Sequence, residues 1–309
     1  MSKKILLTGA TGFLGSHVLS MLLNRTSDDI LILKRSFSDL WRIKELMSNP
    51  RVSYIDIDNN NLDDIDWQNI DTIIHCATEY GRNSNSCYKV LETNLMFPIN
   101  LIECAIKNNV KTFINTDSYF NKENMSYSNL LNYSLSKKSL NMWLKYFSKN
   151  IKIINMVLEH IYGENDNSDK FVERMIQDIA IAPKPFVDLT YGEQKRDFIY
   201  VNDVCETYIA ALKYSRENNF RFRQFDIGTG KPVSIKQFVE TIKLMATGGG
   251  DLPVLNFGKL QYREDEMMCS YADTVELSAL INTDKFLSYQ QGIEKIIKYY
   301  REGKNVNKR

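Results

Sequence analysis

Residues 3–24 read KKILLTGATGFLGSHVLSMLLN and join a short apolar run to a longer apolar pattern through a turn with three glycines. The run at 4–8 is typical of a buried strand, and the apolar residues from 13 to 24 recur at helical spacing. At such a junction the first glycine permits a tight turn, the second lets a pyrophosphate approach the backbone, and the third lets the helix pack on the strand. The stretch therefore predicts a dinucleotide site rather than a connection that binds nothing, with cofactor contacts from Gly9, Thr11, Gly12, Phe13, Leu14 and Gly15.

The alternation of short apolar runs with longer helical segments continues through the first half of the chain. The helices are long enough to return the chain to the same edge of a parallel sheet. We therefore predict the α/β class, with a doubly wound parallel Rossmann sheet and a smaller C-terminal substrate-binding lobe. The sheet domain is expected at 1–160 with a returning segment near 196–230, and the lobe at 161–195 and 231–309. After the strand at 4–8, strands are predicted at 30–34, 52–56, 72–77, 111–116 and 151–158, and helices at 13–24, 39–48, 87–109 and 131–149.

Composition and charge argue against several other classes of protein. The 309 residues hold 39 Lys and Arg against 38 Asp and Glu, so the net charge of +1 gives no general attraction for nucleic acid or an acidic membrane. Five cysteines without a CxxC pair, and only three histidines, predict no metal site and a reducing, cytoplasmic compartment. No apolar stretch approaches the roughly 20 residues that a membrane span needs.

The end of the second predicted strand indicates which dinucleotide binds. A carboxylate there would accept hydrogen bonds from both ribose hydroxyls of NAD, whereas basic residues favour the 2′-phosphate of NADP. Lys34 and Arg35 occupy this place, so the sequence predicts NADP(H), the alternative being that both are solvated loop cations. Asp56 and Ile57, at the end of the third strand, are expected to meet the adenine edge, and Asp56 is almost as compatible with an ordinary loop acid.

Tyr133 and Lys137 are the candidate acid–base pair. They lie four residues apart in a predicted helix and therefore share one face. A nearby ammonium stabilises a phenolate, so we expect Lys137 to lower the pKa of Tyr133 and make it a better proton donor to a developing alkoxide. The preceding strand ends in Thr116 and Ser118, whose hydroxyls are expected to hold the oxygen of a carbonyl group.

Six motifs in order resemble the extended short-chain dehydrogenase/reductase family: TGATGFLG, IIHCATEYG, TDS, YSLSK, LEHIYGEND and GEQKRDFIYVNDV. The resemblance covers Lys3 to about Leu280. Within the family, ATEYG, NTDSYF and LEHIYG are most similar to the CDP-abequose and CDP-paratose synthases, which reduce the 4-keto group of a CDP-3,6-dideoxyhexulose with NADPH. The resemblance implies a homodimer formed through helices of the Rossmann lobe and a C-terminal lobe that binds a nucleotide sugar.

The resemblance also assigns roles to single residues. Thr116, Tyr133 and Lys137 take the catalytic positions, and Lys137 is expected to bind the nicotinamide ribose as well. His160 stands where the family usually has Asn, and it is equally compatible with a packed or loop histidine. Residues expected to pass under the cofactor are Cys76, Ala77 and Thr78. Residues expected to contact the nucleotide sugar are Tyr80, Ser118, His160, Lys170, Phe171, Arg196 and Arg263, of which the two arginines would clamp the diphosphate.

The residues that follow Thr116 help to choose among the reactions of the family. A 4,6-dehydratase needs an Asp-Glu pair there, and this chain has Asp117 followed by Ser118. A 4-epimerase retains NAD, whereas Lys34 and Arg35 favour an exchangeable NADPH. We therefore expect NADPH-dependent reduction of the C4 keto group of a nucleotide-linked 4-keto-6-deoxy or 3,6-dideoxy hexose, CDP-linked, for O-antigen and lipopolysaccharide biosynthesis. The alternatives are an NAD-retaining 4-epimerase, a dTDP-4-keto-6-deoxyhexose reductase and a non-catalytic NADP-binding regulator.

Overall fold

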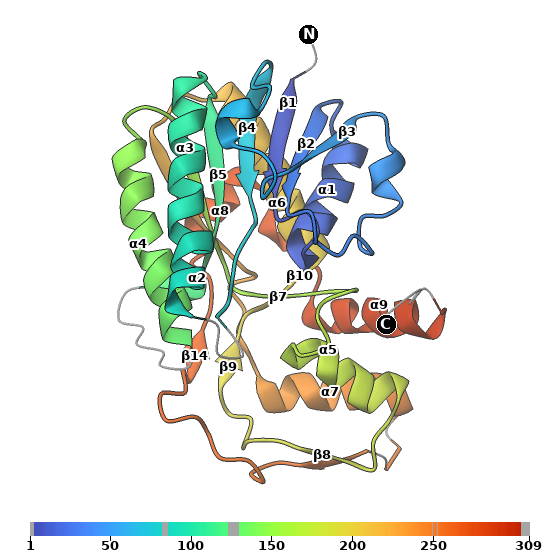
Figure 1. Ribbon diagram of the computed structural model, residues 1–309. Coiled ribbons are helices and arrows are strands. Elements are labelled where there is room, and N and C mark those ends of the chain that lie inside the picture. The colour runs from blue at the N-terminus through green and yellow to red at the C-terminus, as the bar shows by residue number, and fades with distance from the viewer. Residues whose placement is uncertain (1–2, 82–85, 123–129, 249, 252, 304–309) are drawn as a thin grey trace. The chain divides into compact units, whose positions relative to one another are not determined.

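A computed structural model describes residues 3–81, 86–122, 130–248, 250–251 and 253–303 of the chain. The chain folds into two compact units (Figure 1). The first unit comprises Met1–Leu158 and Cys205–Asp226, and the second comprises Glu159–Val204 and Ile227–Arg309. The chain therefore leaves the first unit after Leu158 and returns to it at Cys205.

A parallel sheet forms the centre of the first unit, as predicted for a Rossmann fold. Among the described residues it has seven strands in the order β11-β6-β5-β4-β1-β2-β3, and the pairs from β3 to β6 are all parallel. The order reverses between β1 and β4, which is the place where doubly wound sheets bind ligands. The strands are β1 (Lys4–Thr8), β2 (Asp29–Lys34), β3 (Val52–Asp56), β4 (Ile70–His75), β5 (Thr112–Ser118), β6 (Lys152–Leu158) and β11 (Phe222–Ile227).

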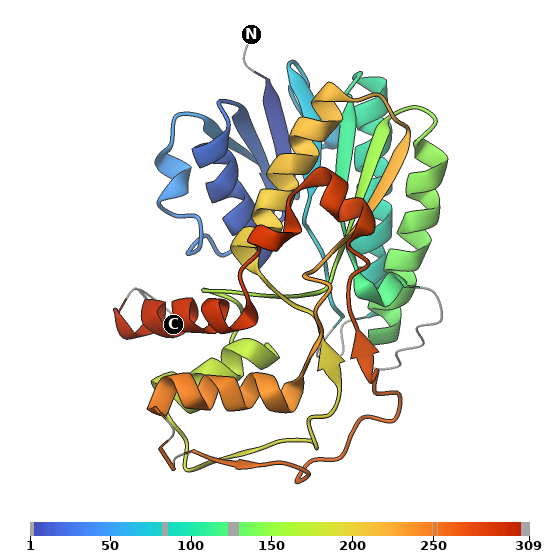
Figure 2. The same ribbon diagram turned by 180° about the vertical axis from the view of Figure 1, so that it is seen from behind.

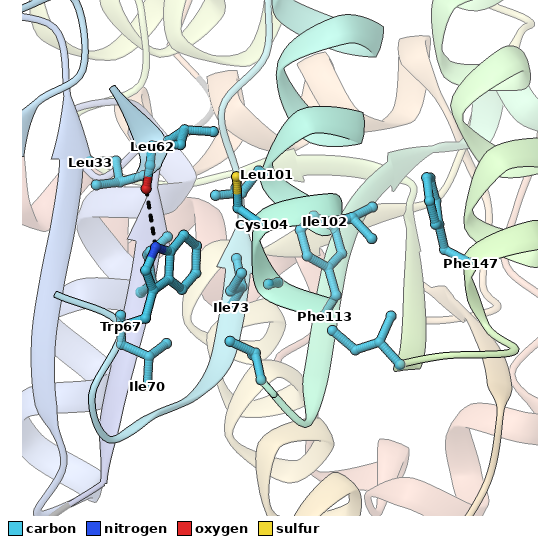
Figure 3. Packing of buried hydrophobic residues seen from close by; sticks show 14 of the residues in the cluster. Leu33, Leu62, Trp67, Ile70, Ile73, Leu101, Ile102, Cys104, Phe113 and Phe147 are labelled. Atoms are coloured by element: carbon cyan, nitrogen blue, oxygen red, sulfur yellow. Dashed lines mark hydrogen bonds between the residues drawn. The ribbon is translucent and has the colours of Figure 1, made fainter. Parts of the chain in front are cut away.

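Helices cover both faces of this sheet because its strands are apolar on both sides. On one face, α3 (Phe97–Lys107) and α4 (Leu131–Phe147) pack against strand residues such as Ile73 and Phe113 (Figure 3). Trp67 fills the edge of this core and donates its indole N–H to the Leu62 carbonyl at 3.1 Å. On the other face lie α1 (Phe13–Arg25) and α6 (Val201–Glu217), joined by an ion pair between Arg25 and Glu206 at 2.6 Å (Figure 2).

Two of the predicted helices differ from the structure. The segment 39–48 forms turns that end in a short 3-10 helix, Leu46–Ser48. The Asp39 carboxylate accepts the amide of Trp41 at 3.1 Å, and such a bond offers the backbone an alternative to a helix. The predicted helix 87–109 is divided into α2 (Cys87–Leu91), a π-helical turn at Glu92–Met96, and α3, where Pro98 near the start of α3 has no amide to donate to a preceding turn.

The strand predicted at 72–77 also differs, because β4 ends at His75. Cys76 and Ala77 therefore begin the loop that follows the strand. The predicted strand at 111–116 extends further, since β5 continues to Ser118 and carries that hydroxyl within the sheet. The other predicted strands and helices of the first unit agree with the structure to within two residues.

The second unit is built from short strands and helices around a separate core. Phe198 and Phe238 stack with ring centroids 4.0 Å apart, and Tyr162 packs edge-on against both. The fully buried Asp197 accepts the amides of Thr229, Gly230 and Ala272, so it joins three segments of this unit. The elements are β7 (His160–Tyr162), β8 (Phe186–Asp188), β9 (Lys195–Arg196), β10 (Phe198–Tyr200), β12 (Val233–Ser234), β13 (Val254–Asn256), β14 (Cys269–Ser270), α5 (Phe171–Ile176), α7 (Ile235–Thr247), α8 (Val275–Leu280) and α9 (Tyr289–Arg301).

None of the helices in the described parts of either unit is long and apolar enough to cross a lipid bilayer.

Arg216 holds the returning helix α6 to the main part of the first unit. Its guanidinium donates to both carboxylate oxygens of Asp28, at 2.8 and 3.1 Å, and to both of Asp71, at 2.9 and 3.1 Å. Burial alone would lower the pKa of this guanidinium, but the bonds to Asp71 and Asp28 raise it above its ordinary value. Asp28 precedes β2 and Asp71 lies in β4, so one side chain joins three distant segments.

We expect Arg216→Met to destabilise the protein on the order of 3 kcal/mol, because it leaves the buried Asp28 carboxylate and the half-buried Asp71 carboxylate near each other without their cation. The matched control is Arg25→Met, which removes the more exposed ion pair between α1 and α6 and should cost less than about 1 kcal/mol. Urea unfolding followed by circular dichroism measures both changes. Equal losses in the two variants would show that Arg216 does not hold the returning segment.

Candidate active site

The glycine turn brings three stretches of backbone together. Gly9 has a φ of +72°, and a Cβ atom there would lie 2.5 Å from the Ala77 nitrogen. A Cβ atom at Gly15 would lie 2.1 Å from the Gly9 carbonyl oxygen. Only glycine fits at these two positions, and their close packing sets the start of α1 directly against the ends of β1 and β4.

The space in front of the turn fits an anionic group. Gly12 is exposed, and a Cβ atom there would meet only the Gly9 carbonyl oxygen, at 3.3 Å. Gly12 is also the N-cap of α1 and has no side chain to cap the helix, so the first amides of α1 point toward this space. Thr11 and Phe13 are half-buried, whereas Leu14 is buried in the core and offers only its backbone. These features are those of a site for a pyrophosphate.

A buried histidine fixes the strand ends beside the turn. The Nδ1 atom of His75 lies 2.8 Å from the hydroxyl of Thr8, and that hydroxyl accepts the amide of Ala77 at 3.3 Å. Burial, and to a smaller extent the charge of Lys137, lowers the pKa of His75 to about 3. The imidazole is therefore neutral and holds Ala77 against Gly9 without introducing charge.

Asn94 is a site residue that no sequence pattern predicted. It is fully buried in the π-helical turn and accepts the Glu79 amide at 2.7 Å and the Thr78 hydroxyl at 3.3 Å. Its own amide group donates to the Glu79 carbonyl at 2.8 Å and to the Ser136 hydroxyl at 3.0 Å. Asn94 thus joins the loop after β4 to helix α4, and the widened helical turn carries it there. A lone asparagine in an apolar helical pattern gives no recognisable signal in the sequence.

Tyr133 lies between two aromatic rings at the start of α4. Its ring stacks on Tyr80 with centroids 5.0 Å apart and meets the edge of Phe120 at 5.9 Å. Burial, with a smaller contribution from Tyr80, raises the pKa of Tyr133 well above its ordinary value, and a hydrogen bond with the Ser118 side chain opposes this rise. The expected lowering of the Tyr133 pKa by Lys137 is therefore wrong for the chain alone, because burial raises this pKa.

Lys137 is buried one helical turn after Tyr133. Its ammonium donates to the backbone carbonyl of Thr116 at 2.7 Å and lies 5.9 Å from the centre of the Tyr133 ring. Burial lowers the pKa of Lys137, whereas the carboxylate of Asp117 acts in the opposite direction. Lys137 therefore joins α4 to the end of β5 and sets the position of both.

The hydroxyl of Thr116 contacts two side chains of the first unit. It lies 2.7 Å from the phenol of Tyr208, a fully buried residue of α6, and 3.4 Å from the sulfur of Cys76. Burial raises the pKa of the Cys76 thiol to about 11, so this group is neutral. Of the two hydroxyls of β5, that of Ser118 is the one that acts on the pKa of Tyr133. Tyr208 was not identified from the sequence, because the segment that carries it is distant along the chain.

Lys34 and Arg35, which are expected to select the cofactor, differ in their exposure and in their partners. Lys34 is buried and forms an ion pair with Asp56, so each of these two residues neutralises the other. Arg35 is exposed, with its guanidinium 4.8 Å from the centre of the Phe37 ring. Ile57 donates its amide to the Lys34 carbonyl at 2.9 Å and continues the pairing of β2 and β3.

The remaining candidates lie in the second unit. Arg196 is buried and donates to the Glu266 carboxylate at 2.5 Å, while Arg263 is exposed. His160 is half-buried, its Nδ1 atom lies 3.6 Å from the Glu159 carboxylate, and burial lowers its pKa. Lys170 is the N-cap of α5 and Phe171 is its first residue.

Comparison with known proteins gives consistent matches. The model of the NAD dependent epimerase/dehydratase family matches residues 5–228. A CDP-abequose synthase from Salmonella muenchen is 32% identical over 302 residues, which cover 96% of this chain and 98% of the relative. A dTDP-4-dehydro-6-deoxyglucose reductase from Escherichia coli is 25% identical over 267 residues, covering 77% and 80%. The fold is similar to that of a UDP-glucuronic acid 4-epimerase from Bacillus cereus in complex with NAD, with a TM-score of 0.81, 24% identity and coverage of 97% and 99%.

Removal of each of the two hydroxyls of β5 is expected to have a different effect, one on turnover and the other on stability. We expect Ser118→Ala to lower kcat for carbonyl reduction about 10²-fold, because it removes the donor next to Tyr133. Thr116→Val should instead lower stability by about 1–3 kcal/mol, because it leaves buried Tyr208 without its partner, with less than a tenfold effect on kcat. Steady-state kinetics and thermal unfolding measure the two effects. Loss of turnover in a fully stable Thr116→Val variant would return the substrate-binding role to Thr116.

Proposed function

The chain belongs to the NAD dependent epimerase/dehydratase family, and from this premise we propose that it is an NADPH-dependent nucleotide-sugar 4-ketoreductase. Its substrate is a 4-keto-6-deoxy or 3,6-dideoxy hexose linked to CDP, and its product serves the synthesis of a surface polysaccharide such as O-antigen. The observations that carry the proposal are the near full-length match to CDP-abequose synthases and the placement of the Tyr133 phenol, a proton donor, one helical turn before Lys137 beside the end of β5. A reductase needs a proton donor at the start of its reaction, whereas an epimerase must first remove a proton from a hydroxyl group.

Different side chains of the protein contribute to the reduction of a carbonyl group. The glycine turn and the first amides of α1 would hold NADPH, which would supply the hydride for the carbonyl carbon. Tyr133 gives its phenolic proton to the carbonyl oxygen, and Ser118 donates a hydrogen bond beside it. Lys137 holds the Thr116 backbone in place, and its ammonium stabilises the phenolate that proton transfer leaves on Tyr133. Tyr80 stacks on Tyr133 and excludes water from one face of that ring.

The carboxylate beside the site supports reduction over elimination of water. Asp117 is buried and accepts the Asn155 amide at 2.7 Å and the Ser118 amide at 2.8 Å. A carboxylate fixed by two donors is poorly placed to carry protons to and from a sugar. The next position holds the Ser118 hydroxyl, which cannot act as a second carboxylic acid.

The charges around the expected nucleotide sites support the choice of ligands. Exposed Arg35 follows β2. A cation at this place binds the 2′-phosphate and so favours NADPH over NADH. In the second unit, Arg196 and Arg263 are suited to a diphosphate, since guanidinium groups bind phosphate oxygens in pairs. Glu266 holds the Arg196 guanidinium in one orientation before any ligand binds. The CDP-abequose synthases of Salmonella, which align over nearly the whole chain, support CDP as the nucleotide.

An exposed apolar stripe on α4 supports a homodimer formed through the first unit. Leu131, Leu135, Met142 and Tyr146 recur at helical spacing and are each more than half exposed, and α2, which packs beside α4, adds exposed Tyr88 (Figure 1). Stripes of this kind on soluble proteins mark association surfaces, and a twofold axis would place the stripe against its own copy.

We expect Met142→Glu to shift the protein from dimer to monomer, because the stripe would then bury two like charges near the axis. Sedimentation velocity at micromolar concentration measures this shift. The matched control is Leu244→Glu, which places the same charge on an equally exposed apolar residue of α7. A wild-type monomer, or a dimer that both variants retain, would contradict this interface.

The reduction itself is tested by incubating the protein with NADPH and a panel of CDP- and dTDP-linked 4-keto sugars. We expect NADPH oxidation in equal amount to a reduced sugar product, detected by absorbance and by mass spectrometry. Tyr133→Phe keeps the ring and its stacking on Tyr80 but should lower kcat about 10²- to 10⁴-fold with little change in KM. Interconversion of C4 epimers without NADPH consumption would instead identify a 4-epimerase.

A further inference from the structure

A row of polar side chains crosses the apolar sheet of the first unit. Thr8 of β1 pairs in register with His75 of β4. His75 in turn pairs with Asn115 of β5, and Asn115 with Asn155 of β6. The residues two positions earlier in these strands belong to the core under α3 and α4, so the row lies on that face. At most 1% of each of the four residues is exposed, and each polar atom therefore needs a hydrogen-bond partner inside the protein.

The Asp117 carboxylate fixes the orientation of the two asparagines. A carboxylate accepts hydrogen bonds, so the Nδ2 atom of Asn155 is the one that faces it, at 2.7 Å. The Oδ1 atom of Asn155 accepts the Nδ2 atom of Asn115, also at 2.7 Å. Because oxygen and nitrogen lie on opposite sides of an amide group, the Oδ1 atom of Asn115 points away from β6 and toward β4. This buried oxygen has no hydrogen-bond partner among the residues that the structure describes.

The Thr8 hydroxyl fixes the tautomer of His75. It accepts the Ala77 amide at 3.3 Å, and its own proton is donated to the Nδ1 atom of His75 at 2.8 Å. Burial keeps the imidazole neutral, so the proton of the ring lies on Nε2. The Nε2 atom faces away from Thr8 and is likewise buried without a partner in the described part of the chain. A donor on β4 and an acceptor on β5 are thus neighbours, and both lack a hydrogen bond.

A buried donor and acceptor on adjacent strands are the partners that a single internal water molecule uses. We propose that one water molecule binds between His75 and Asn115 and completes a hydrogen-bond chain from Ala77 to Asp117, which positions the Asp117 carboxylate near Lys137. Every member of this chain donates in the same direction. It begins at the amide of Ala77, passes through the polar row, and ends at the carboxylate.

The chain ends at the charge that compensates Lys137. Burial lowers the pKa of Lys137, and the Asp117 carboxylate opposes this effect. The ammonium also donates to the carbonyl of Thr116, the residue before Asp117. Ala77 lies in the loop that is expected to contact the cofactor, so the chain links this loop to Lys137. The water site does not depend on any reaction, whereas the effect of the chain on turnover rests on the proposed reduction.

A high-resolution crystal structure of the protein without cofactor tests the water site. We expect density for one water molecule within hydrogen-bond distance of both His75 Nε2 and Asn115 Oδ1. The sequence has three histidines, so NMR of protein with ¹⁵N-labelled histidine gives a simple spectrum, in which loss of a signal in His75→Phe assigns that residue. At pH 7 the imidazole of His75 should be neutral with its proton on Nε2. No density between these atoms, or a proton on Nδ1, overturns the proposal.

Asn155→Leu tests the positioning of Asp117, because it removes a donor to that carboxylate at similar side-chain volume. We expect kcat for reduction to fall about tenfold, the effect of one lost hydrogen bond to a charged group, with KM changed less than about twofold. The matched control is Thr72→Val, which removes a buried hydroxyl of β4 that has no partner among the described residues. Thr72 lies on the other face of the sheet, so this variant should keep the kcat of the wild type.

A folded Asn155→Leu variant with unchanged kcat would show that the chain does not position Asp117. Should this variant unfold, Asn155→Thr carries the test, since its single hydroxyl cannot serve both Asp117 and Asn115, and kcat should fall without a change in KM. If the protein reduces the 4-keto sugar but holds no water between His75 and Asn115, the inference alone fails. If the water is present and NADPH is not consumed, the proposed reaction fails and the water site stands.

Discussion

The contact of three backbone segments at Gly9 is the constraint on which the rest of the site depends. The end of β1, the start of α1 and the loop after β4 approach more closely there than a single Cβ atom would permit. This approach turns the first amides of α1 toward open space and fixes Ala77 beside them. The hydrogen bonds of His75 and Thr8 maintain the contact from the interior of the sheet. From Ala77 the loop runs to Thr78 and Glu79, where Asn94 joins it to α4. The close packing at the glycine turn thus also sets the position of Tyr133.

Burial determines the charges of the groups that this packing brings together. His75 and Cys76 are neutral because the interior disfavours their charged forms, and the same effect keeps the proton on Tyr133. Lys137 is subject to the same penalty and is compensated by Asp117 and by the Thr116 carbonyl. The result is a proton donor beside a hydroxyl and a nearby ammonium, which suits the protonation of an oxygen that gains negative charge.

Features encoded in local patterns could be predicted from the sequence, and features made by distant contacts could not. The strand, glycine turn and helix at 4–24 follow from apolar spacing, and the shared face of Tyr133 and Lys137 follows from helical geometry. The segment 39–48 has a helical pattern, but two hydrogen bonds hold it in turns. The Asp39 carboxylate accepts the amide of Trp41, and Arg42 donates to the Thr11 carbonyl. Asn94, Tyr208 and the pairing of Lys34 with Asp56 depend on residues 15 to 92 positions apart, so no local signal marks them.

The central claim is that this chain reduces a carbonyl group with hydride from an exchangeable cofactor and a proton from Tyr133. The most direct measurement uses NADPH that carries deuterium at the transferred position, together with a CDP-4-keto-6-deoxy sugar, and determines the mass of the product. The account predicts one deuterium in the sugar for each NADPH oxidised, and loss of this transfer in Tyr133→Phe. An unlabelled product formed while the NADPH concentration stays constant would contradict it.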